Sequence, residues 1–375
     1  MTIFPGAGSI EIRVAVARGV VCSVEIRSTR PIGLTRVFLG REPNEAPALA
    51  RQLFSLCGAA QAAAASQAVA WAQGRRLEQG EIFGYAIGVL AERVFEGLRG
   101  LALGWPGSEN QDAVQARAAP HLREAATATR ALLSASASGL GRARRQELLD
   151  FHARLLEAAY GLGVSHPLGA PAAASSHLAR IARQCESETA FISSPVDALT
   201  QADDAAVIAA LGRAPETFVG EPSLPNRRVE TGPFARFGES AGVRAEGLAP
   251  RLNARLADIA EALSSLATSL RSGDVDLAAA PVGGAAGPGA GFGAVESARG
   301  RLYHLAQITS RGRVGEYRIV APTEWNFHAN GPFVAAVLGA GVARGGRAQT
   351  SLARLAALFD PCVGFEVALK EFADA

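Results

Sequence analysis

The 375-residue chain contains few cysteines, a single lysine and almost no net charge. Its four cysteines, Cys22, Cys57, Cys185 and Cys362, show no short spacing, which excludes the disulfide framework of a small secreted protein. The lone lysine is Lys370, and a net charge of +2 argues against a general electrostatic attraction to nucleic acid. These scarcities favour a protein that folds around an apolar core in a reducing compartment.

We also expect neither a signal peptide nor a membrane span. The first residues, MTIFPGAGSIEIRV, lack a basic segment followed by an apolar one. The most apolar stretch, residues 53–72, is mostly alanine interrupted by Gln61, Ser66 and Gln67, which predicts a closely packed buried helix. No P-loop and no strand-placed Gly-x-Gly-x-x-Gly motif is present. A cytoplasmic protein with no membrane partner and no nucleic-acid partner is therefore expected.

Period-two alternation predicts two small antiparallel β pieces, one near each end of the chain. Residues 9–27 alternate apolar and polar side chains on both sides of Ala17-Arg18-Gly19, which predicts a β-hairpin. Residues 301–309 and 314–321 form a second hairpin candidate, and residues 36–40 predict a further short strand.

Helical patterns fill most of the remainder. One helix is predicted from Asn44, a candidate N-cap, to about residue 73. Further helices are predicted at 81–103, 113–135, 142–161, 175–191, 196–211, 249–273, 333–343 and 347–372. Residues 213–247 are predicted to be irregular, and the Gly- and Pro-rich stretch 278–300 to be a flexible linker.

The expected fold is α+β and predominantly α. We expect residues 1–375 to form a single domain whose mainly helical body spans 44–273. The hairpin at 9–27 precedes this body, and a β-hairpin with C-terminal helices occupies 301–375.

Two short segments each contain one cysteine where a metal-binding Cys-x-x-Cys pair would contain two. They are LFSLCGAA (53–60) and LFDPCVGF (358–365). Free cysteine is among the most buried residue types and often only packs, so the sequence spacing alone does not assign Cys57 and Cys362 to a shared site.

Four segments in order resemble the large subunit of nickel-iron hydrogenases. They are GREPNEAPALARQLFSLCGAA (40–60), TGPFARF (231–237), the stretch from VESARG to FVAAVLG (295–339), and LFDPCVGF (358–365). The middle of the chain, roughly 75–215, matches poorly. The resemblance implies a large-subunit-like fold, with a helical bundle body and small β pieces near each end.

The departures from that family indicate a different function. In the family, two Cys-x-x-Cys pairs hold nickel and iron through four thiolates, which are soft ligands suited to both metals. Cys57 and Cys362 match one cysteine of each pair, but Ala60 and Phe365 stand where the other two would be. The resemblance therefore implies that no nickel is bound. Because Ala368 replaces the histidine that precedes the family's cleavage point, we expect residues 372–375 to stay on the chain.

This pattern resembles the hydrogenase expression/formation proteins of the HupK/HoxV type. The resemblance implies a non-enzymatic maturation factor that acts as a transient scaffold for an iron unit carrying cyanide and carbon monoxide. Cys57 and Cys362 would be the metal ligands, and Arg299, Pro322 and Thr323 would bind the diatomic ligands. The implied partners are the hydrogenase large-subunit precursor and a small assembly chaperone.

Each of these assignments has a plainer alternative. Arg299 could be a structural arginine that bonds backbone carbonyls, and Pro322-Thr323 could be no more than a strand end. The basic residues Arg30, Arg36 and Arg41 would usually form a solvated face, but they could instead meet an acidic partner. The whole protein could be an interaction mimic that docks on hydrogenase subunits or chaperones without metal, or a redox enzyme with an altered metal centre.

Overall fold

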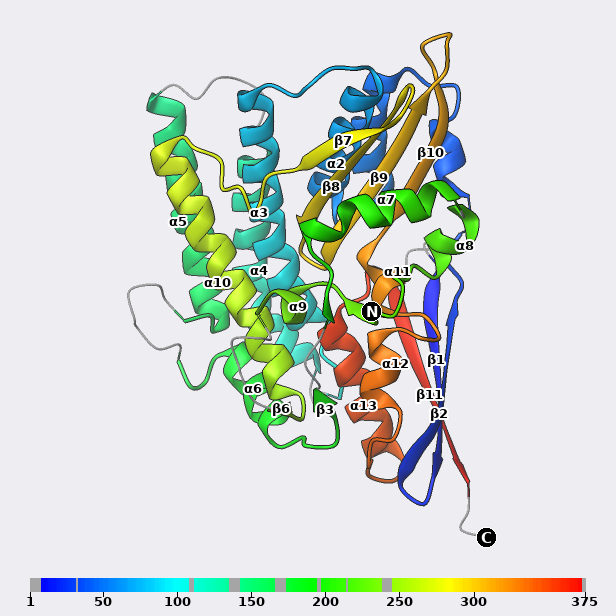
Figure 1. Ribbon diagram of the computed structural model, residues 1–375. Coiled ribbons are helices and arrows are strands. Elements are labelled where there is room, and N and C mark those ends of the chain that lie inside the picture. The colour runs from blue at the N-terminus through cyan, green and yellow to red at the C-terminus, as the bar shows by residue number, and fades with distance from the viewer. Residues whose placement is uncertain are drawn as a thin grey trace.

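The computed structural model describes residues 8–31, 33–107, 111–134, 142–165, 173–193, 197–213, 215–237 and 245–372. A bundle of long helices lies beside two β-sheets (Figure 1). The bundle is formed by α3 (Gln79–Leu103), α4 (Gln111–Ser134), α5 (Arg142–Leu162) and α10 (Ala249–Ser272). These helices match the predictions at 81–103, 113–135, 142–161 and 249–273, so the α+β, predominantly helical fold is confirmed.

Shorter helices connect the bundle to the sheets. They are α1 (Ala46–Leu53), α2 (Gly58–Ala72), α6 (His177–Glu186), α7 (Asp204–Arg213), α8 (Pro215–Gly220), α9 (Pro233–Phe237), α11 (Pro322–Asn326), α12 (Pro332–Val337) and α13 (Gly346–Phe359), with 3-10 turns η1 (Leu34–Phe38), η2 (Pro43–Glu45) and η3 (Gln201–Asp203). The strand predicted at 36–40 is wrong, since η1 occupies it. The predicted helix 175–191 ends at Glu186, and the one predicted at 196–211 begins only at Asp204.

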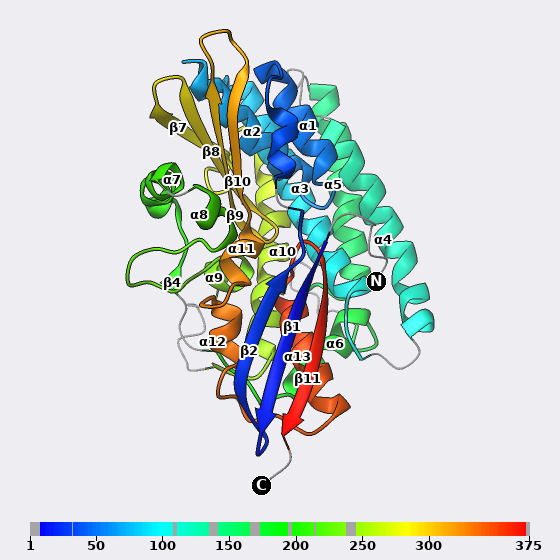
Figure 2. The same cartoon turned by 90° about the vertical axis from the view of Figure 1, so that its right-hand side faces the viewer.

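The first sheet joins both ends of the chain (Figure 2). The predicted hairpin is present as β1 (Ser9–Ala17) and β2 (Val20–Ser28), with positive φ angles at Arg18 and Gly19 in its turn. Strand β11 (Gly364–Phe372) pairs with β1 in parallel. The helix predicted at 347–372 is therefore wrong beyond Phe359, because Phe365, Val367 and Leu369 alternate toward the core with the period of a strand.

The second sheet has four antiparallel strands in the order β10-β9-β8-β7. They are β7 (Val282–Gly287), β8 (Ala290–Ser297), β9 (Gly300–Ile308) and β10 (Val314–Val320). The linker predicted at 278–300 is wrong, since its glycines allow close packing instead of flexibility. A Cβ on Gly293 would lie 2.0 Å from the carbonyl oxygen of Ala64 in α2, and one on Gly291 would lie 2.4 Å from that of Ala68.

Helices cover both faces of this second sheet. Leu302 and Ala306 of β9 pack with the alanines of α2, whereas Tyr303 and Leu305 pack with α7 and α8. Two further pairs of short strands are β3 (Ile192–Ser193) with β6 (Ala245–Glu246) and β4 (Asp197–Ala198) with β5 (Val229–Glu230). Strands β5 and β6 lie in the region 213–247 that was predicted to be irregular, whereas β4 occupies the start of the helix predicted at 196–211. None of the helices in the described ranges is long and apolar enough to cross a membrane.

The helix predicted from Asn44 to residue 73 is broken, and the break positions a cysteine. Helix α1 ends at Leu53, and α2 begins at Gly58 after a tight connection. Gly58 is required there because a Cβ would lie 2.9 Å from the carbonyl oxygen of Arg51. Cys57 consequently lies at the N-terminal end of α2 instead of inside a helix.

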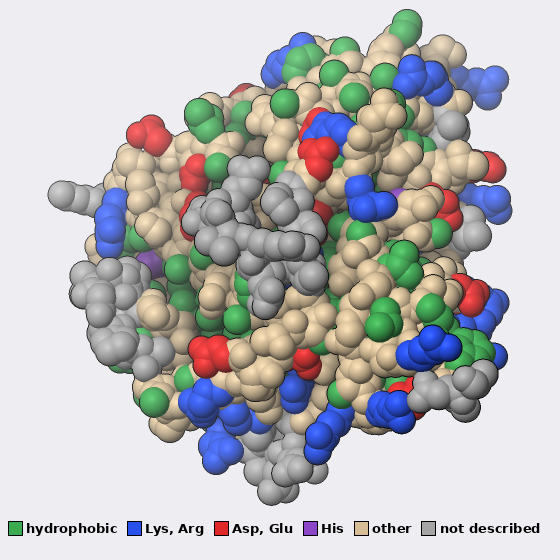
Figure 3. All heavy atoms as spheres, turned by 60° about the horizontal axis from the view of Figure 1, so that its bottom comes forward, with side chains coloured by type: hydrophobic (Ala, Val, Ile, Leu, Met, Phe, Trp, Pro, Cys, Tyr) green, Lys and Arg blue, Asp and Glu red, His purple; other side chains and the backbone are tan. Residues whose placement is uncertain are grey.

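The end of the molecule seen in Figure 3 mixes charged and apolar side chains. Among the described side chains on that face, basic groups lie along the lower edge and also at the top and right of the view, and apolar groups are scattered between them. Scattered exposed apolar side chains are ordinary on a protein surface. The candidate functional residues lie instead inside the molecule, where the two sheets and the helical bundle meet.

Candidate functional site

Cys57 is half-buried at the start of α2, and its sulfur receives a hydrogen bond from a neutral side chain. The Nε2 of Gln61, one helical turn further on, donates to Cys57 Sγ over 3.4 Å. The other end of the Gln61 amide, Oε1, lies 2.8 Å from Nε2 of His304, whose Nδ1 lies 2.8 Å from the hydroxyl of Tyr317. Burial lowers the pKa of His304 to about 3, so its ring is neutral, donating to Gln61 and accepting from Tyr317.

Cys362 is half-buried in the connection between α13 and β11, and Thr323 of α11 bonds to it twice. The Thr323 hydroxyl donates to Cys362 Sγ over 3.2 Å and accepts from the Cys362 backbone N–H over 3.1 Å. Pro322 precedes it as the first residue of α11. Thr323 therefore contacts the candidate ligand cysteine directly, and Pro322 only begins the helix that carries Thr323.

Arg299 links the two cysteine-bearing segments. It lies in the tight turn between β8 and β9 and is 3% exposed. Its Nη1 donates to the carbonyl oxygen of Leu56 over 3.2 Å, and its Nε lies 3.4 Å from a carboxylate oxygen of Asp360. Its Nη2 donates to Glu96 of α3 over 2.9 Å. The carboxylates of Asp360 and Glu96 raise the pKa of Arg299 against the opposing effect of burial.

The two cysteine sulfurs lie within electrostatic reach of each other. Burial, and then the charges of Glu92 and Cys362, raise the pKa of the Cys57 thiol to about 12, while Arg299 and Gln61 act in the opposite direction. Cys57 is therefore a thiol at neutral pH. A metal that binds it must displace its proton, because only the thiolate is a strong ligand.

The positions of the two missing cysteines are filled by apolar side chains. Ala60 in the first turn of α2 is fully buried, and its backbone N–H donates to Glu92 of α3 over 3.0 Å. Glu92 also accepts from the N–H of Ala59 over 2.6 Å, and burial raises its pKa to about 7. Phe365 on β11 packs against the main core. Neither position offers a ligand.

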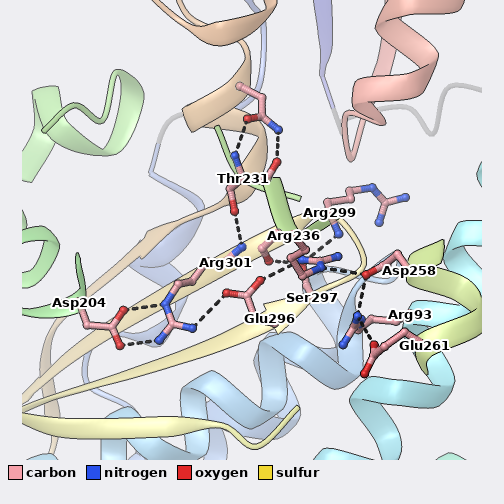
Figure 4. A network of polar contacts seen from close by, with 12 residues as sticks. Arg93, Asp204, Thr231, Arg236, Asp258, Glu261, Glu296, Ser297, Arg299 and Arg301 are labelled. Atoms are coloured by element: carbon pink, nitrogen blue, oxygen red, sulfur yellow. Dashed lines mark hydrogen bonds and ion pairs between the residues drawn. The ribbon is translucent and has the colours of Figure 1, made fainter. Parts of the chain in front are cut away.

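A buried ionic network holds the β8–β9 turn in place (Figure 4). Its members come from six elements: Arg93 (α3), Asp204 (α7), Arg236 (α9), Asp258 (α10), Glu296 (β8) and Arg301 (β9). Within it, Arg236 bridges Asp258 at 2.8 Å and Glu296 at 2.9 Å. The backbone N–H of Arg301 donates to the Thr231 hydroxyl over 2.7 Å. Breaking such buried pairs is destabilising, so the network fixes the turn that carries Arg299.

The sequence interpretation of Arg30 is wrong. Its side chain is only 19% exposed and forms an ion pair with Glu324, the residue after Thr323. Arg36 and Arg41, by contrast, are exposed as predicted. Arg30 was missed because its partner lies near the other end of the chain. Gln61 could have been found from sequence, because residues four apart share one face of a helix.

The other sequence assignments are settled by local contacts. His304 is a core histidine whose two ring nitrogens both have hydrogen-bond partners. Cys22 is exposed on β2, and Cys185 is buried in α6. Within the described residues, no group of three or more His, Cys, Asp or Glu side chains is placed to hold a metal. The site thus offers two sulfurs, each hydrogen-bonded by a neutral donor and both close to Arg299.

The sequence of the chain is similar to sequences of known hydrogenase-related proteins. The family model described as nickel-dependent hydrogenase matches residues 242–367. The chain is 44% identical over 375 residues to a hydrogenase expression/formation protein HupK of Rhizobium leguminosarum bv. viciae, covering all of both chains. It is 34% identical to HupK of Bradyrhizobium diazoefficiens, covering 96% of this chain and 97% of that protein. It is 30% identical to the expression/formation protein HoxV of Cupriavidus necator, covering 93% of each.

Among solved structures, the chain is similar to an NAD+-reducing [NiFe]-hydrogenase in the H2-reduced state. The TM-score is 0.62 at 15% identity, and the match covers 92% of this chain and 93% of that one. An identity this low shows the shared fold alone. The full-length match to the expression/formation proteins goes further: the chain belongs to the HupK/HoxV family of hydrogenase expression/formation proteins and has the fold of a nickel-iron hydrogenase large subunit.

Proposed function

We propose that this accessory protein of hydrogenase formation is a transient scaffold for an iron unit that carries cyanide and carbon monoxide. The unit would bind through the sulfurs of Cys57 and Cys362 and then pass to the hydrogenase large-subunit precursor. A small assembly chaperone would help to deliver it. The protein itself would catalyse no reaction.

One observation carries the proposal: two half-buried cysteines from opposite ends of the chain lie around one buried arginine. Arg299 contacts the carbonyl of Leu56, next to Cys57, and the carboxylate of Asp360, two residues before Cys362. Thiolates are soft ligands that suit iron with diatomic ligands. The absence of the other two cysteines leaves positions on the iron for those ligands.

A two-thiolate site also suits a carrier, because a carrier must release its cargo. Fewer protein ligands mean weaker retention, and both sulfurs here also accept hydrogen bonds from neutral donors, Gln61 and Thr323. Such hydrogen bonds draw electron density from sulfur and tune its strength as a ligand. The guanidinium of Arg299 would lie near the cyanide nitrogens, which accept hydrogen bonds.

The test is an infrared spectrum of the protein purified without oxygen from cells that express the hydrogenase assembly genes. Metal-bound cyanide and carbon monoxide absorb where proteins do not. We expect bands in the wild type that disappear in Cys57→Ser and in Cys362→Ser. Cys22→Ser, which alters an exposed cysteine on β2, is the matched control and should keep the bands.

A wild-type spectrum without bands, from cells whose hydrogenase is active, would reject the scaffold. Hydrogenase maturation that is unaffected by either cysteine substitution would reject it as well. The surviving function would then be that of a docking mimic that binds hydrogenase subunits or chaperones without metal.

A further inference from the structure

We propose that Arg30 forms, together with Arg299, a pair of guanidinium groups around the two cysteines that makes the site selective for an anionic iron unit over bare iron. This inference rests on the proposed function, since it specifies the charge of the cargo that the same site would accept. It assigns a role in binding to Arg30, a residue that sequence reasoning placed on a solvated face.

The position of Arg30 follows from its contacts. Arg30 lies two residues after Ser28, the last residue of β2, and its guanidinium forms an ion pair with Glu324. Glu324 directly follows Thr323, whose hydroxyl donates to Cys362 Sγ. The side chain of Arg30 is 19% exposed, whereas that of Arg27, three residues earlier on β2, is 63% exposed. Arg30 is therefore turned inward, toward the segment that holds Cys362.

Electrostatics support the same placement. The sulfur of Cys362 is the largest influence on the Arg30 guanidinium and raises its pKa. Glu324 raises this pKa too, and Cys57 contributes in the same direction. Arg299 also responds to both sulfurs, although Asp360 and Glu96 affect it more. Both guanidinium groups thus lie close enough to the cysteine pair to respond to its charge.

The charges around the site leave one guanidinium group in excess. Arg30 pairs with Glu324, while Arg299 shares Glu96 with Arg99 and Asp360 with Arg255. Four arginines therefore face three carboxylates. A fourth carboxylate, Glu92, accepts two backbone N–H bonds at the start of α2, where the helix dipole offsets its charge.

This excess of positive charge matches the charge of a loaded site. Iron(II) bound by two thiolates is neutral as a group. Each cyanide ligand adds one negative charge, whereas carbon monoxide adds none. An iron unit that already carries cyanide is therefore an anion at this site and is attracted by Arg30 and Arg299. Bare iron(II), a cation, is repelled before it reaches the sulfurs.

The local charge around Cys362 can be measured without a bound iron unit by comparing the reaction rates of two alkylating reagents of similar size. Iodoacetate is an anion and iodoacetamide is neutral, and both react only with the thiolate. The ratio of their rates at one cysteine is therefore independent of the thiolate fraction and reports the local potential. Mass spectrometry of peptides separates Cys362 from the exposed Cys22, which serves as an internal reference.

We expect the iodoacetate to iodoacetamide ratio at Cys362 to be higher than at Cys22 in the wild type. Arg30→Gln should lower it about threefold at Cys362, the effect of one unit charge several ångströms away in a largely aqueous surrounding. Arg30→Lys should keep most of the ratio because it keeps the charge. Arg36→Gln, which removes an exposed arginine of the same region, should leave it unchanged.

Arg30→Gln leaves the Glu324 carboxylate without its partner and could unfold the protein. A comparison of Glu324→Gln with the double variant Arg30→Gln/Glu324→Gln avoids this problem, since neither contains an unpaired carboxylate at that position. The ratio at Cys362 should again be about threefold lower in the variant that lacks Arg30. An equal ratio in these two variants, or in wild type and folded Arg30→Gln, would overturn the assignment of Arg30.

The two proposals fail in different ways. A wild type without infrared bands would reject the iron scaffold while leaving the measured ratio as it is. Infrared bands that depend on both cysteines, together with an iodoacetate to iodoacetamide ratio that does not change when Arg30 is replaced, would support the scaffold. They would reject only the proposed role of the guanidinium pair.

Discussion

The contact between α2 and β8 positions Cys57, and one added methyl group tests how tight that contact is. Helix α2 begins directly after Cys57, and the turn after β8 carries Arg299. In Gly293→Ala the new Cβ would lie 2.0 Å from the carbonyl oxygen of Ala64 and 2.8 Å from the Cβ of Gln67. Real Cβ atoms essentially never approach other atoms closer than 3.0 Å, so the helix and the strand must separate by about 1 Å.

The magnitude follows from the kind of atom that the methyl group meets. A backbone carbonyl inside a helix cannot rotate away, in contrast to the end of a flexible side chain. Overpacking of a core typically destabilises by about 1–3 kcal/mol, and we expect this site to lie at the upper end. For a chain of this size, a loss of about 3 kcal/mol corresponds to a melting temperature that is lower by roughly 4 °C.

The assay is thermal unfolding followed by circular dichroism, with Gly80→Ala as the matched control. A Cβ on Gly80, near the start of α3, would meet nothing within 4 Å, so the same substitution should be neutral or stabilise by up to about 1 kcal/mol. The separation of α2 from β8 in Gly293→Ala should also weaken the bond between Arg299 and the carbonyl of Leu56. A Gly293→Ala protein that melts at or above the wild-type temperature would refute the close helix–sheet packing.

Two other measurements test the state of the site and of the chain end. Because burial and neighbouring charge raise the pKa of Cys57 to about 12, the protonated thiol is favoured at neutral pH. Its alkylation by iodoacetamide should therefore rise about tenfold per pH unit between pH 7 and 10 without levelling off, whereas a thiol with an ordinary pKa near 8.5 would level off in that range. A plateau for Cys57 below pH 10 would contradict the burial assigned to it. The intact mass of the protein from cells with active hydrogenase should include residues 372–375, since Ala368 replaces the histidine that precedes the family's cleavage point. A mass lower by the seven residues 369–375 would show that this interpretation is wrong.

Helix α10 was predictable because it buries one face along most of its length, and the pattern with a period of 3.6 residues over 249–273 survives in it. Helix α3 was predictable from its long apolar run, since residues 86–94 are buried on all sides between the bundle and the second sheet. The strand β11 was missed for the opposite reason. It is a half-exposed strand that follows α13 after only a brief turn, so its alternating pattern was interpreted as a continuation of the preceding helix.

The error at 278–300 has a steric cause that composition does not reveal. Glycine is frequent in linkers because it is flexible, but it is also required where one backbone approaches another closely. Gly291 and Gly293 serve the second purpose, and the alanines of α2 are the matching half of the same contact. Only the placement of α2 against β8 distinguishes the two uses, and that placement links segments more than two hundred residues apart.

Within the candidate site, contacts between residues close in sequence were predictable, whereas contacts between distant residues were not. The neighbours of Cys57 along its helix, such as Gln61, could be read from spacing. Arg30 and Glu324 could not be paired in this way, because they lie near opposite ends of the chain and become neighbours only when β2 and α11 fold around the cysteines. The resemblance to hydrogenase large subunits supplied Arg299 and Thr323, but it does not supply Arg30.

Under the proposed function, the two missing cysteines would make the remaining pair suited to a temporary load. Ala60 is sealed in the core between α2 and the second sheet, and its N–H is bound to Glu92, so that position offers no polar atom to a metal. Phe365 places a ring on β11 where the fourth sulfur would be. The two remaining sulfurs each accept a hydrogen bond, from Gln61 and from Thr323, and the ion-paired arginines Arg299 and Arg30 belong to neighbouring segments. Under the proposed function, such a site would hold an iron unit through two thiolates and through charge, and both interactions would be given up to a partner that offers four thiolates.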